Sequence, residues 1–242
     1  MQIIISKDFE SLSVNAALAI TEIMTNKSNP LICVASGDSP SGIYKNIVAS
    51  VKQKELDINQ WHFLGLDEWV GLNGADEGSC RWHLNREIFN PLNIQEESIC
   101  FFDGASNNLE QECAITESYI QNNGGIEIAI LGLGMNGHIG MNEPQTPISS
   151  RSHVIELDAI TIEVGQKYFN KPQPLTKGIT LGIATLLEAK HILLIVTGIK
   201  KAGIVKQVIE DPISELIPAS LLRNHPNCSI YLDEAAASNL SL

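Results

Sequence analysis

Short apolar runs alternate with longer amphipathic stretches along the chain, and this alternation limits the possible folds more than any other feature. Each run has the length of a strand, and most are apolar on both faces, which is typical of strands buried in a parallel sheet. The runs are residues 3–5, 31–35, 63–66, 99–102, 126–133, 191–197 and 228–232. The helix-like stretches are residues 9–25, 40–52, 80–89, 109–121, 179–189 and 200–209.

This order of elements predicts an α/β fold: a doubly wound, mostly parallel, Rossmann-like sheet with helices on both faces. The chain has 242 residues, which suits one large domain. Because neither a linker nor an internal repeat interrupts the pattern, we expect a single domain over residues 1–242.

Composition limits the possible partners and the compartment. The net charge of −12 argues against nucleic acids and anionic membranes, because both are polyanions. The sequence has neither a signal-peptide pattern nor 18 consecutive apolar residues, so we expect no membrane span. The five cysteines lack C-x-x-C spacing, which argues against disulfides and a cysteine-rich zinc site. We therefore expect a cytoplasmic protein.

Ligands of open parallel sheets bind outside the carboxyl ends of the strands, so polar residues after each apolar run are the candidates for a site. Gly37, Asp38 and Ser39 follow the run 31–35 and precede a helical pattern. Gly37 permits a tight turn, Ser39 can cap the helix, and Pro40 suits its first position. The free N–H groups of such a helix N-terminus can hold a phosphate, although an ordinary capped helix has the same pattern.

Charged pairs follow two other runs. Asp67 and Glu68 come after residues 63–66, where a carboxylate can act as a general base beside a ligand. The alternative for this pair is a helix cap or a solvated loop. Lys200 and Lys201 begin another helical pattern and oppose its dipole, a conflict that an anionic ligand would remove. The alternative for the lysines is a solvated pair.

The stretch GLGMNGHIGMNEP, residues 132–144, follows the run 126–131. Its glycines permit a sharp turn and close approach to a ligand. Histidine is the side chain best suited to proton transfer near neutral pH, and Glu143 is near enough to orient His138. A structural histidine in a glycine-rich turn is the alternative. Because His138 and Glu143 lack the H-E-x-x-H spacing, we expect no metal. The combined inventory suits proton transfer on a small phosphorylated molecule.

Several motifs, taken in order, resemble the glucosamine-6-phosphate deaminase family over nearly the whole chain. They are LDEWVGL (66–72), GLGMNGHIGMNEP (132–144), SRSHVIELD (150–158), KGITLGIATLLEAKHILLIVTGIKKA (177–202) and IPASLLRNHPN (217–227). LDEW followed by GSC at residues 78–80 is similar to the galactosamine-6-phosphate isomerase (deaminating) branch.

The resemblance implies a cofactor-independent aldose–ketose isomerisation of an amino-sugar 6-phosphate with loss of ammonia. The GSC variant favours galactosamine 6-phosphate as substrate and tagatose 6-phosphate as product. Glucosamine 6-phosphate giving fructose 6-phosphate is the alternative. Because a C2 imine is hydrolysed at the end of the reaction, we expect a hydrolase as well as an isomerase, acting in amino-sugar metabolism.

The resemblance also implies residue roles. Asp67 would take the C2 proton and deliver it to C1, while His138 would assist ring opening and Glu143 would orient His138. Glu68 would have no chemical role. The phosphate would be held by Gly37, Asp38, Ser39 and Lys201.

Four positions depart from the family's pattern. Asn136 stands where the best-known members carry aspartate, so it can hydrogen-bond the imidazole without supplying charge. Lys167 aligns with a phosphate-binding arginine and offers a point charge in place of a bidentate fork. His153 and Ile155 stand where members controlled by an N-acetylated sugar phosphate carry basic residues. We therefore expect no such control, and a monomer or small homo-oligomer.

Two other functions are compatible with this architecture. 6-Phosphogluconolactonases hydrolyse an ester and need no base at C2. Sugar-phosphate-sensing domains are normally attached to a DNA-binding helix-turn-helix, which we do not expect because the first apolar run begins at the start of the sequence. The LDEW and NEP motifs favour the deaminase over both.

Overall fold

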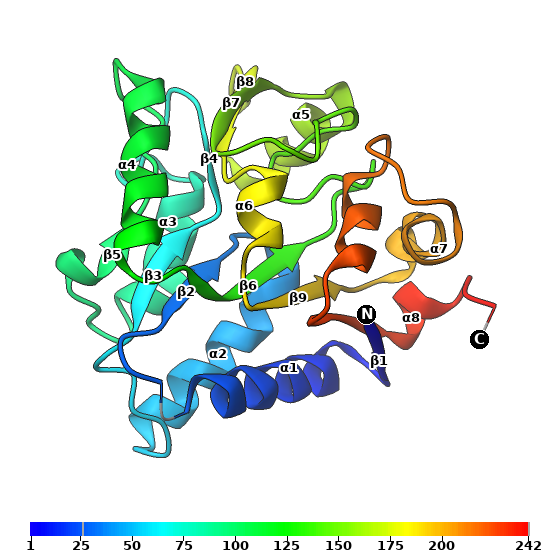
Figure 1. Ribbon diagram of the computed structural model, residues 1–242, viewed down its shortest axis with the longest axis horizontal. Coiled ribbons are helices and arrows are strands. Elements are labelled where there is room, and N and C mark those ends of the chain that lie inside the picture. Colours follow the sequence, from blue (N-terminus) through cyan, green and yellow to red (C-terminus); the bar gives the residue numbers. More distant parts are fainter. Residues whose placement is uncertain (26, 242) are drawn as a thin grey trace.

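The computed structural model describes residues 1–25 and 27–241. Its main feature is a seven-stranded sheet of order β1-β10-β9-β6-β2-β3-β5 (Figure 1). Every neighbouring pair in this sheet is parallel, which confirms the predicted fold class. The strands are β1 (Gln2–Ser6), β10 (Cys228–Asp233), β9 (His191–Val196), β6 (Ile126–Gly132), β2 (Leu31–Val34), β3 (His62–Gly65) and β5 (Ile99–Cys100).

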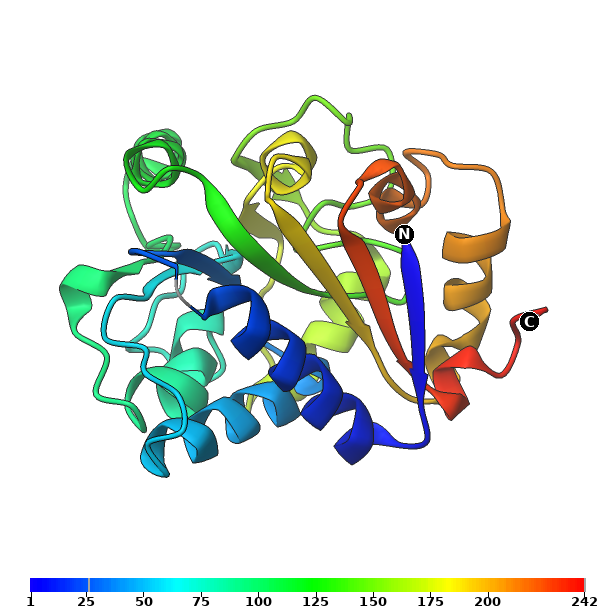
Figure 2. The same cartoon turned by 60° about the horizontal axis from the view of Figure 1, so that its bottom comes forward.

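Helices cover both faces of the main sheet (Figures 1 and 2). One face carries α1 (Phe9–Met24) and α2 (Asp38–Lys52), and the other carries α4 (Leu109–Asn122), α6 (Ile183–Leu187) and α7 (Ala202–Glu210). Side chains along each strand point alternately to the two faces. In β2, for example, Ile32 packs into the core beneath α1 and α2, whereas Cys33 packs into the opposite core. This explains why the predicted strands are apolar on both faces.

A smaller, antiparallel sheet of order β4-β8-β7 adjoins the main one. Its strands are β4 (Asp67–Trp69), β8 (Lys177–Thr180) and β7 (His153–Glu156). The chain passes from β3 to β4 through Leu66 alone, so the small sheet is joined directly to the carboxyl end of a main-sheet strand.

The helix predicted over residues 179–189 is wrong in its first half, because β8 occupies that part and α6 begins only at Ile183. Glycines on either side explain the difference. A Cβ atom at Gly178 would lie 2.1 Å from Met141 Sδ, and one at Gly182 would lie 2.1 Å from the Ser150 carbonyl oxygen. Both glycines therefore serve close packing, and glycine is a poor helix former.

The remaining elements are short. The predicted helix 80–89 is α3 (Cys80–Leu84) followed by the π-helical turn η1 (Asn85–Phe89). The others are η2 (Glu96–Ser98), α5 (Ala159–Gly165), η3 (Gln166–Tyr168), η4 (Ile199–Lys201), η5 (Pro218–Asn224) and α8 (Glu234–Ala237). Among the described residues, no helix combines the length and apolarity that crossing a bilayer requires.

Candidate active site

A cavity of about 240 Å³ lies at the carboxyl ends of β2, β3, β6 and β9. Its walls are formed mainly by the segments that follow these four strands, as the sheet topology leads one to expect. Most predicted site residues line it, and these are Gly37, Asp38, Ser39, Asp67, His138, Lys167 and Lys201. Asn136 and Glu143 do not line the cavity. Asn136 bonds to the backbone N–H of His138 and to Glu143, and Glu143 lies beside the His138 imidazole.

The N-terminus of α2 forms one wall of the cavity. The helix begins at Asp38, with Gly37 as its N-cap, so the predicted capping role of Ser39 is wrong and Pro40 does not take the first position. Ser39 Oγ instead lies 3.4 Å from Thr197 Oγ1. Gly37 has a φ of 113°, which favours glycine. No side chain among the described residues caps this helix, so its first N–H groups are available to an anion.

Two lysines bring positive charge to the same wall. Burial and the nearby Lys167 charge lower the pKa of Lys201 to about 8, and its Nζ donates to the Leu133 carbonyl oxygen. Lys167 Nζ lies 2.6 Å from Asp38 Oδ2. Burial disfavours the Lys167 cation, but its contacts with Asp38 and Tyr168 together outweigh burial and raise the Lys167 pKa. The structure therefore brings Lys167 beside the helix terminus, although its ammonium pairs with a carboxylate of the protein.

Asp67 lies at the junction of the two sheets, as the first residue of β4. Its side chain lines the cavity and is buried. Burial raises the Asp67 pKa to about 6, against the opposing effects of a hydrogen bond from Cys80 and the charge of His138. A partly desolvated carboxylate is a stronger base than an exposed one.

Glu68 is also buried but has a different environment. Its Oε1 accepts hydrogen bonds from the backbone N–H groups of Trp69 and Cys80, and its Oε2 accepts one from Arg81. The carboxylate thus satisfies N–H groups at the start of α3 and does not line the cavity. This placement supports a structural role for Glu68.

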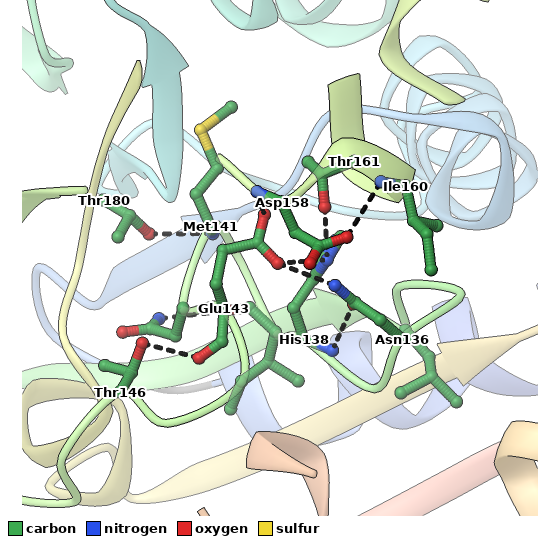
Figure 3. Close-up of polar contacts among 12 residues, drawn as sticks. Asn136, His138, Met141, Glu143, Thr146, Asp158, Ile160, Thr161 and Thr180 are labelled. Carbon is green, nitrogen blue, oxygen red and sulfur yellow. Dashed lines mark hydrogen bonds and ion pairs between the residues drawn. The ribbon is translucent and has the colours of Figure 1, made fainter. Parts of the chain in front are cut away.

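His138 is held by a polar network (Figure 3). Its Nδ1 lies 3.5 Å from Glu143 Oε2, and its backbone N–H donates to Asn136 Oδ1 over 3.2 Å. Asn136 Nδ2 donates to Glu143 Oε2 over 2.8 Å. Burial would raise the Glu143 pKa, but hydrogen bonds, those of His138 foremost, outweigh burial and lower it. Since Nδ1 is directed at protein partners, Nε2 is the nitrogen left for a ligand.

Gly134 fixes the position of the imidazole from its face. A Cβ atom at Gly134 would lie 2.4 Å from three ring atoms of His138, so any side chain there would displace the ring. The glycine-rich turn in the sequence therefore has a packing function as well as a conformational one.

The sequence reasoning missed several cavity residues, among them Cys80, Thr161 and Tyr168. Thr161 and Tyr168 come from α5 and η3, which lie between two strands of the small sheet. Inspection of main-sheet strand ends could not find them. Cys80 is the first residue of α3 and carries no local signal beyond its position after Ser79. Among residues 1–25 and 27–241, no three His, Cys, Asp or Glu side chains are grouped as a metal ion would require.

A known protein family and several named proteins resemble this chain over most of its length. The model of the family described as glucosamine-6-phosphate isomerases/6-phosphogluconolactonase matches residues 9–230. The glucosamine-6-phosphate deaminase of Clostridium tetani is 38% identical over 98% of this chain and 99% of its own length. That of Bacillus velezensis is 37% identical over the same shares of the two chains.

Solved structures agree with these matches. A monomeric glucosamine-6-phosphate deaminase superposes with a TM-score of 0.95 and 32% identity, covering 99% of this chain and 100% of the other. A 6-phosphogluconolactonase from Trypanosoma cruzi has a TM-score of 0.79 at 19% identity, covering 100% and 97% of the two chains, which shows a common fold alone.

The predicted assignment as a hydrolase is wrong, because the matched relatives are deaminases. The chain therefore belongs to the family of glucosamine-6-phosphate isomerases and 6-phosphogluconolactonases, as an enzyme of the isomerase/deaminase type.

Proposed function

We propose that the chain is a glucosamine-6-phosphate deaminase, converting glucosamine 6-phosphate and water into fructose 6-phosphate and ammonia within a single domain, residues 1–242. One observation carries this proposal: a buried carboxylate, Asp67, and the histidine His138 line the same cavity as a helix terminus whose N–H groups are available to an anion. The names of the matched relatives favour the gluco substrate over the galacto substrate suggested by residues 78–80.

His138 would open the sugar ring. Its Nε2 takes the proton of the C1 hydroxyl as the C1–O5 bond breaks, and the same proton passes to the ring oxygen. Glu143 holds the imidazole in place for this transfer. Asn136 bonds the Glu143 carboxylate and the His138 backbone N–H, so its predicted hydrogen bond to the imidazole is wrong. The product of the step is the open-chain aldehyde with its amine at C2.

Asp67 would then transfer the C2 proton. Its carboxylate removes the proton to give an enolate that bears the C2 amine, and returns it to C1. One amine proton passes to O1, which leaves an imine at C2 and a hydroxyl at C1. Water adds to the imine and ammonia departs, giving the ketose. No step requires a metal or an organic cofactor. A lactonase reaction would have no use for a base at C2, so the buried Asp67 favours the deaminase.

The phosphate would occupy the wall formed by the start of α2. Backbone groups of Gly37 and Asp38 and the Ser39 hydroxyl lie there, and Lys201 supplies the partly buried charge. Lys167 would join them by releasing Asp38. These contacts hold a group that does not react, so they serve binding more than chemistry.

The test is ammonia release from glucosamine 6-phosphate and galactosamine 6-phosphate, measured side by side as kcat/KM. We expect the gluco sugar to be preferred. A preference for the galacto sugar would restore the other substrate, and no ammonia from either would remove the deaminase proposal. We further propose a monomer or small homo-oligomer, because the similar solved structure is that of a monomeric enzyme. We propose a cytoplasmic location on the basis of the five cysteines without C-x-x-C spacing. Sedimentation of the purified chain tests its size.

The pH dependence of kcat/KM follows from the two shifted groups in the cavity. Asp67 must be ionised to accept a proton, and its raised pKa of about 6 predicts that activity falls below that pH. Lys201 must be protonated to hold phosphate, and its lowered pKa of about 8 predicts a second fall above that pH. The two falls together give a bell-shaped profile. The two pKa values belong to the free enzyme, because kcat/KM reports the ionisation of the free enzyme.

The substrate phosphate also titrates near pH 6, so the inhibition constant of a sugar-alcohol 6-phosphate is measured over the same range. If the inhibition constant changes with pH in the same way as the acidic side of the kcat/KM profile, the substrate phosphate is the group that titrates there. A midpoint near pH 4, the ordinary value for aspartate, would contradict the assignment of Asp67.

Replacing Lys201 with alanine should raise KM by about 10- to 100-fold and change kcat by less than about threefold, because Lys201 contacts a non-reacting group. Steady-state kinetics measure both constants. Lys200→Ala is the matched control, since Lys200 is its exposed neighbour outside the cavity. An unchanged KM for Lys201→Ala would remove this residue from the phosphate site.

A further inference from the structure

We propose that Thr161 is a positioning residue for His138, whose hydroxyl holds the Nδ1 side of the imidazole and links it to helix α5. The inference rests on the deaminase reaction proposed above. Thr161 Oγ1 lies 3.1 Å from His138 Nδ1, whereas Glu143 Oε2 lies 3.5 Å away (Figure 3). Thr161 is 5% exposed, so water does not readily replace its hydroxyl. The hydroxyl is thus the nearer of the two partners.

Asn136 shares the Glu143 carboxylate with the imidazole. Its amide donates to Glu143 Oε2 over 2.8 Å, so it shares the carboxylate oxygen that faces the histidine. The other oxygen, Oε1, accepts the backbone N–H of Asp158 over 3.2 Å. Asn136 is neutral and adds no charge of its own. The orientation of His138 therefore depends on a second acceptor, and Thr161 supplies it.

A hydroxyl can accept one hydrogen bond while it donates another. Oγ1 can accept from Nδ1–H and pass its own hydrogen toward Glu143, and a hydrogen bond from Thr161 contributes to the lowered pKa of that carboxyl. This arrangement keeps the ring proton on Nδ1 and leaves the Nε2 lone pair free. Ring opening needs that lone pair, because Nε2 must take the proton of the C1 hydroxyl before returning it to the ring oxygen.

Helix α5 links this contact to the substrate cavity. Its N-cap, Asp158, accepts from the Ile160 N–H over 2.8 Å and donates its own N–H to Glu143. Ile160 and Val164 of the same helix line the cavity, and the chain continues into η3, which carries Lys167. One short helix and its N-cap thus contact His138 and Glu143, and the same helix lines the cavity proposed for the sugar. A sugar phosphate that shifts α5 would also adjust the imidazole.

The kinetic test uses Thr161→Val, which keeps the shape of the side chain and removes the hydroxyl, and Thr161→Ser, which restores the hydroxyl. We expect the valine variant to lose about tenfold in kcat/KM, as for one lost hydrogen bond to a charged group, and the serine variant to recover most of it. The deuterium isotope effect on kcat/KM, from substrate labelled at C2, should fall toward one in the valine variant. When ring opening and closing are slower, each opened sugar molecule goes on to the C2 proton transfer more often than it closes again. The proton transfer then no longer limits kcat/KM.

Thr185→Val is the matched control. Thr185 is equally buried and donates to a carboxylate oxygen of Glu117 over 2.6 Å, away from the cavity. We expect its kinetics and isotope effect to match the wild type. Kinetics of Thr161→Val within twofold of the wild type, or a larger isotope effect, would overturn the proposal. Thr161→Ala replaces the valine variant if the latter does not fold.

A second measurement separates this inference from the deaminase proposal. ¹⁵N NMR of the unliganded wild-type protein reports which ring nitrogen of His138 carries the proton in the neutral imidazole. We expect Nδ1 in the wild type and a mixture of tautomers in Thr161→Val. A neutral ring protonated on Nε2 in the wild type would refute the positioning role, whatever the substrate. Absence of ammonia release would refute the deaminase alone.

Discussion

Asp67→Asn should lower kcat by about 10²- to 10⁴-fold, the range for loss of a general base, and abolish exchange of the C2 proton. Asparagine keeps the size of the side chain but cannot accept a proton. Asp67 lines the cavity near His138 and is not one of the proposed phosphate ligands. The inhibition constant of a sugar-alcohol 6-phosphate should therefore stay within about threefold of the wild-type value. Deuterium incorporation at C2 of recovered substrate, in D₂O, measures the exchange.

Asp211→Asn is the control for this substitution, because Asp211 is exposed and follows α7 outside the cavity. It should exchange deuterium as the wild type does. If Asp67→Asn still incorporates deuterium at an undiminished rate, another group is the base. The buried Glu68 is the nearest other carboxylate in sequence, but its oxygens bond to backbone N–H groups.

His138→Gln should lower kcat/KM by about 10²- to 10³-fold, because glutamine fills similar space but cannot carry a proton between two oxygens. The C2 isotope effect should fall toward one, as ring opening becomes the slow step. His138→Gln should therefore lower kcat/KM more than Thr161→Val does, and it should change the isotope effect in the same direction. Steady-state kinetics with C2-labelled and unlabelled substrate measure both quantities.

His62→Gln provides the comparison, because His62 lies at the amino end of β3 and contacts the Tyr119 hydroxyl away from the cavity. It should leave the kinetics unchanged. A variant at His138 that retains a third or more of the wild-type kcat/KM would show that ring opening does not depend on this residue.

The main sheet was predictable because its inner strands are buried on both faces, so that apolarity alone marks them. The small sheet was not, because β4 and β7 are three or four residues long and contain charged side chains. Strands of that kind acquire their structure from pairing. Asp67, for example, pairs with Thr180, which is distant in sequence.

The site was predictable where a main-sheet strand ends, as at Gly37, Asp67, His138 and Lys201. Lys167 came only from the family resemblance, since η3 is not a strand end. Thr161 was missed for the same reason: it lies on a helix between β7 and β8. Its part in the site depends on where that helix packs, which neither spacing nor composition encodes.

The GSC motif at residues 78–80 suggested the galacto substrate, but the structural functions of its first two residues are local. Gly78 has a φ of 95°, and a Cβ atom there would lie 2.4 Å from Phe169 Cδ1. Ser79 caps α3 by accepting the Trp82 N–H over 3.0 Å. Gly78 and Ser79 therefore serve a turn and a cap, whereas Cys80 lines the cavity and donates a hydrogen bond to Asp67. The epimers differ at one hydroxyl, and discrimination between them needs a hydrogen-bonding partner for that hydroxyl.

The ion pair between Lys167 and Asp38 gives the cavity an internal competitor for its ligand. Both side chains are substantially exposed, so the pair contributes at most about 1 kcal/mol. A phosphate dianion, held also by Lys201 and the helix terminus, can displace a single carboxylate at that small cost. A monovalent anion such as chloride carries less charge, so its binding would gain less free energy when it displaces the Asp38 carboxylate. The enzyme would then discriminate against the abundant small anions of a cell by keeping one of its two cations already engaged.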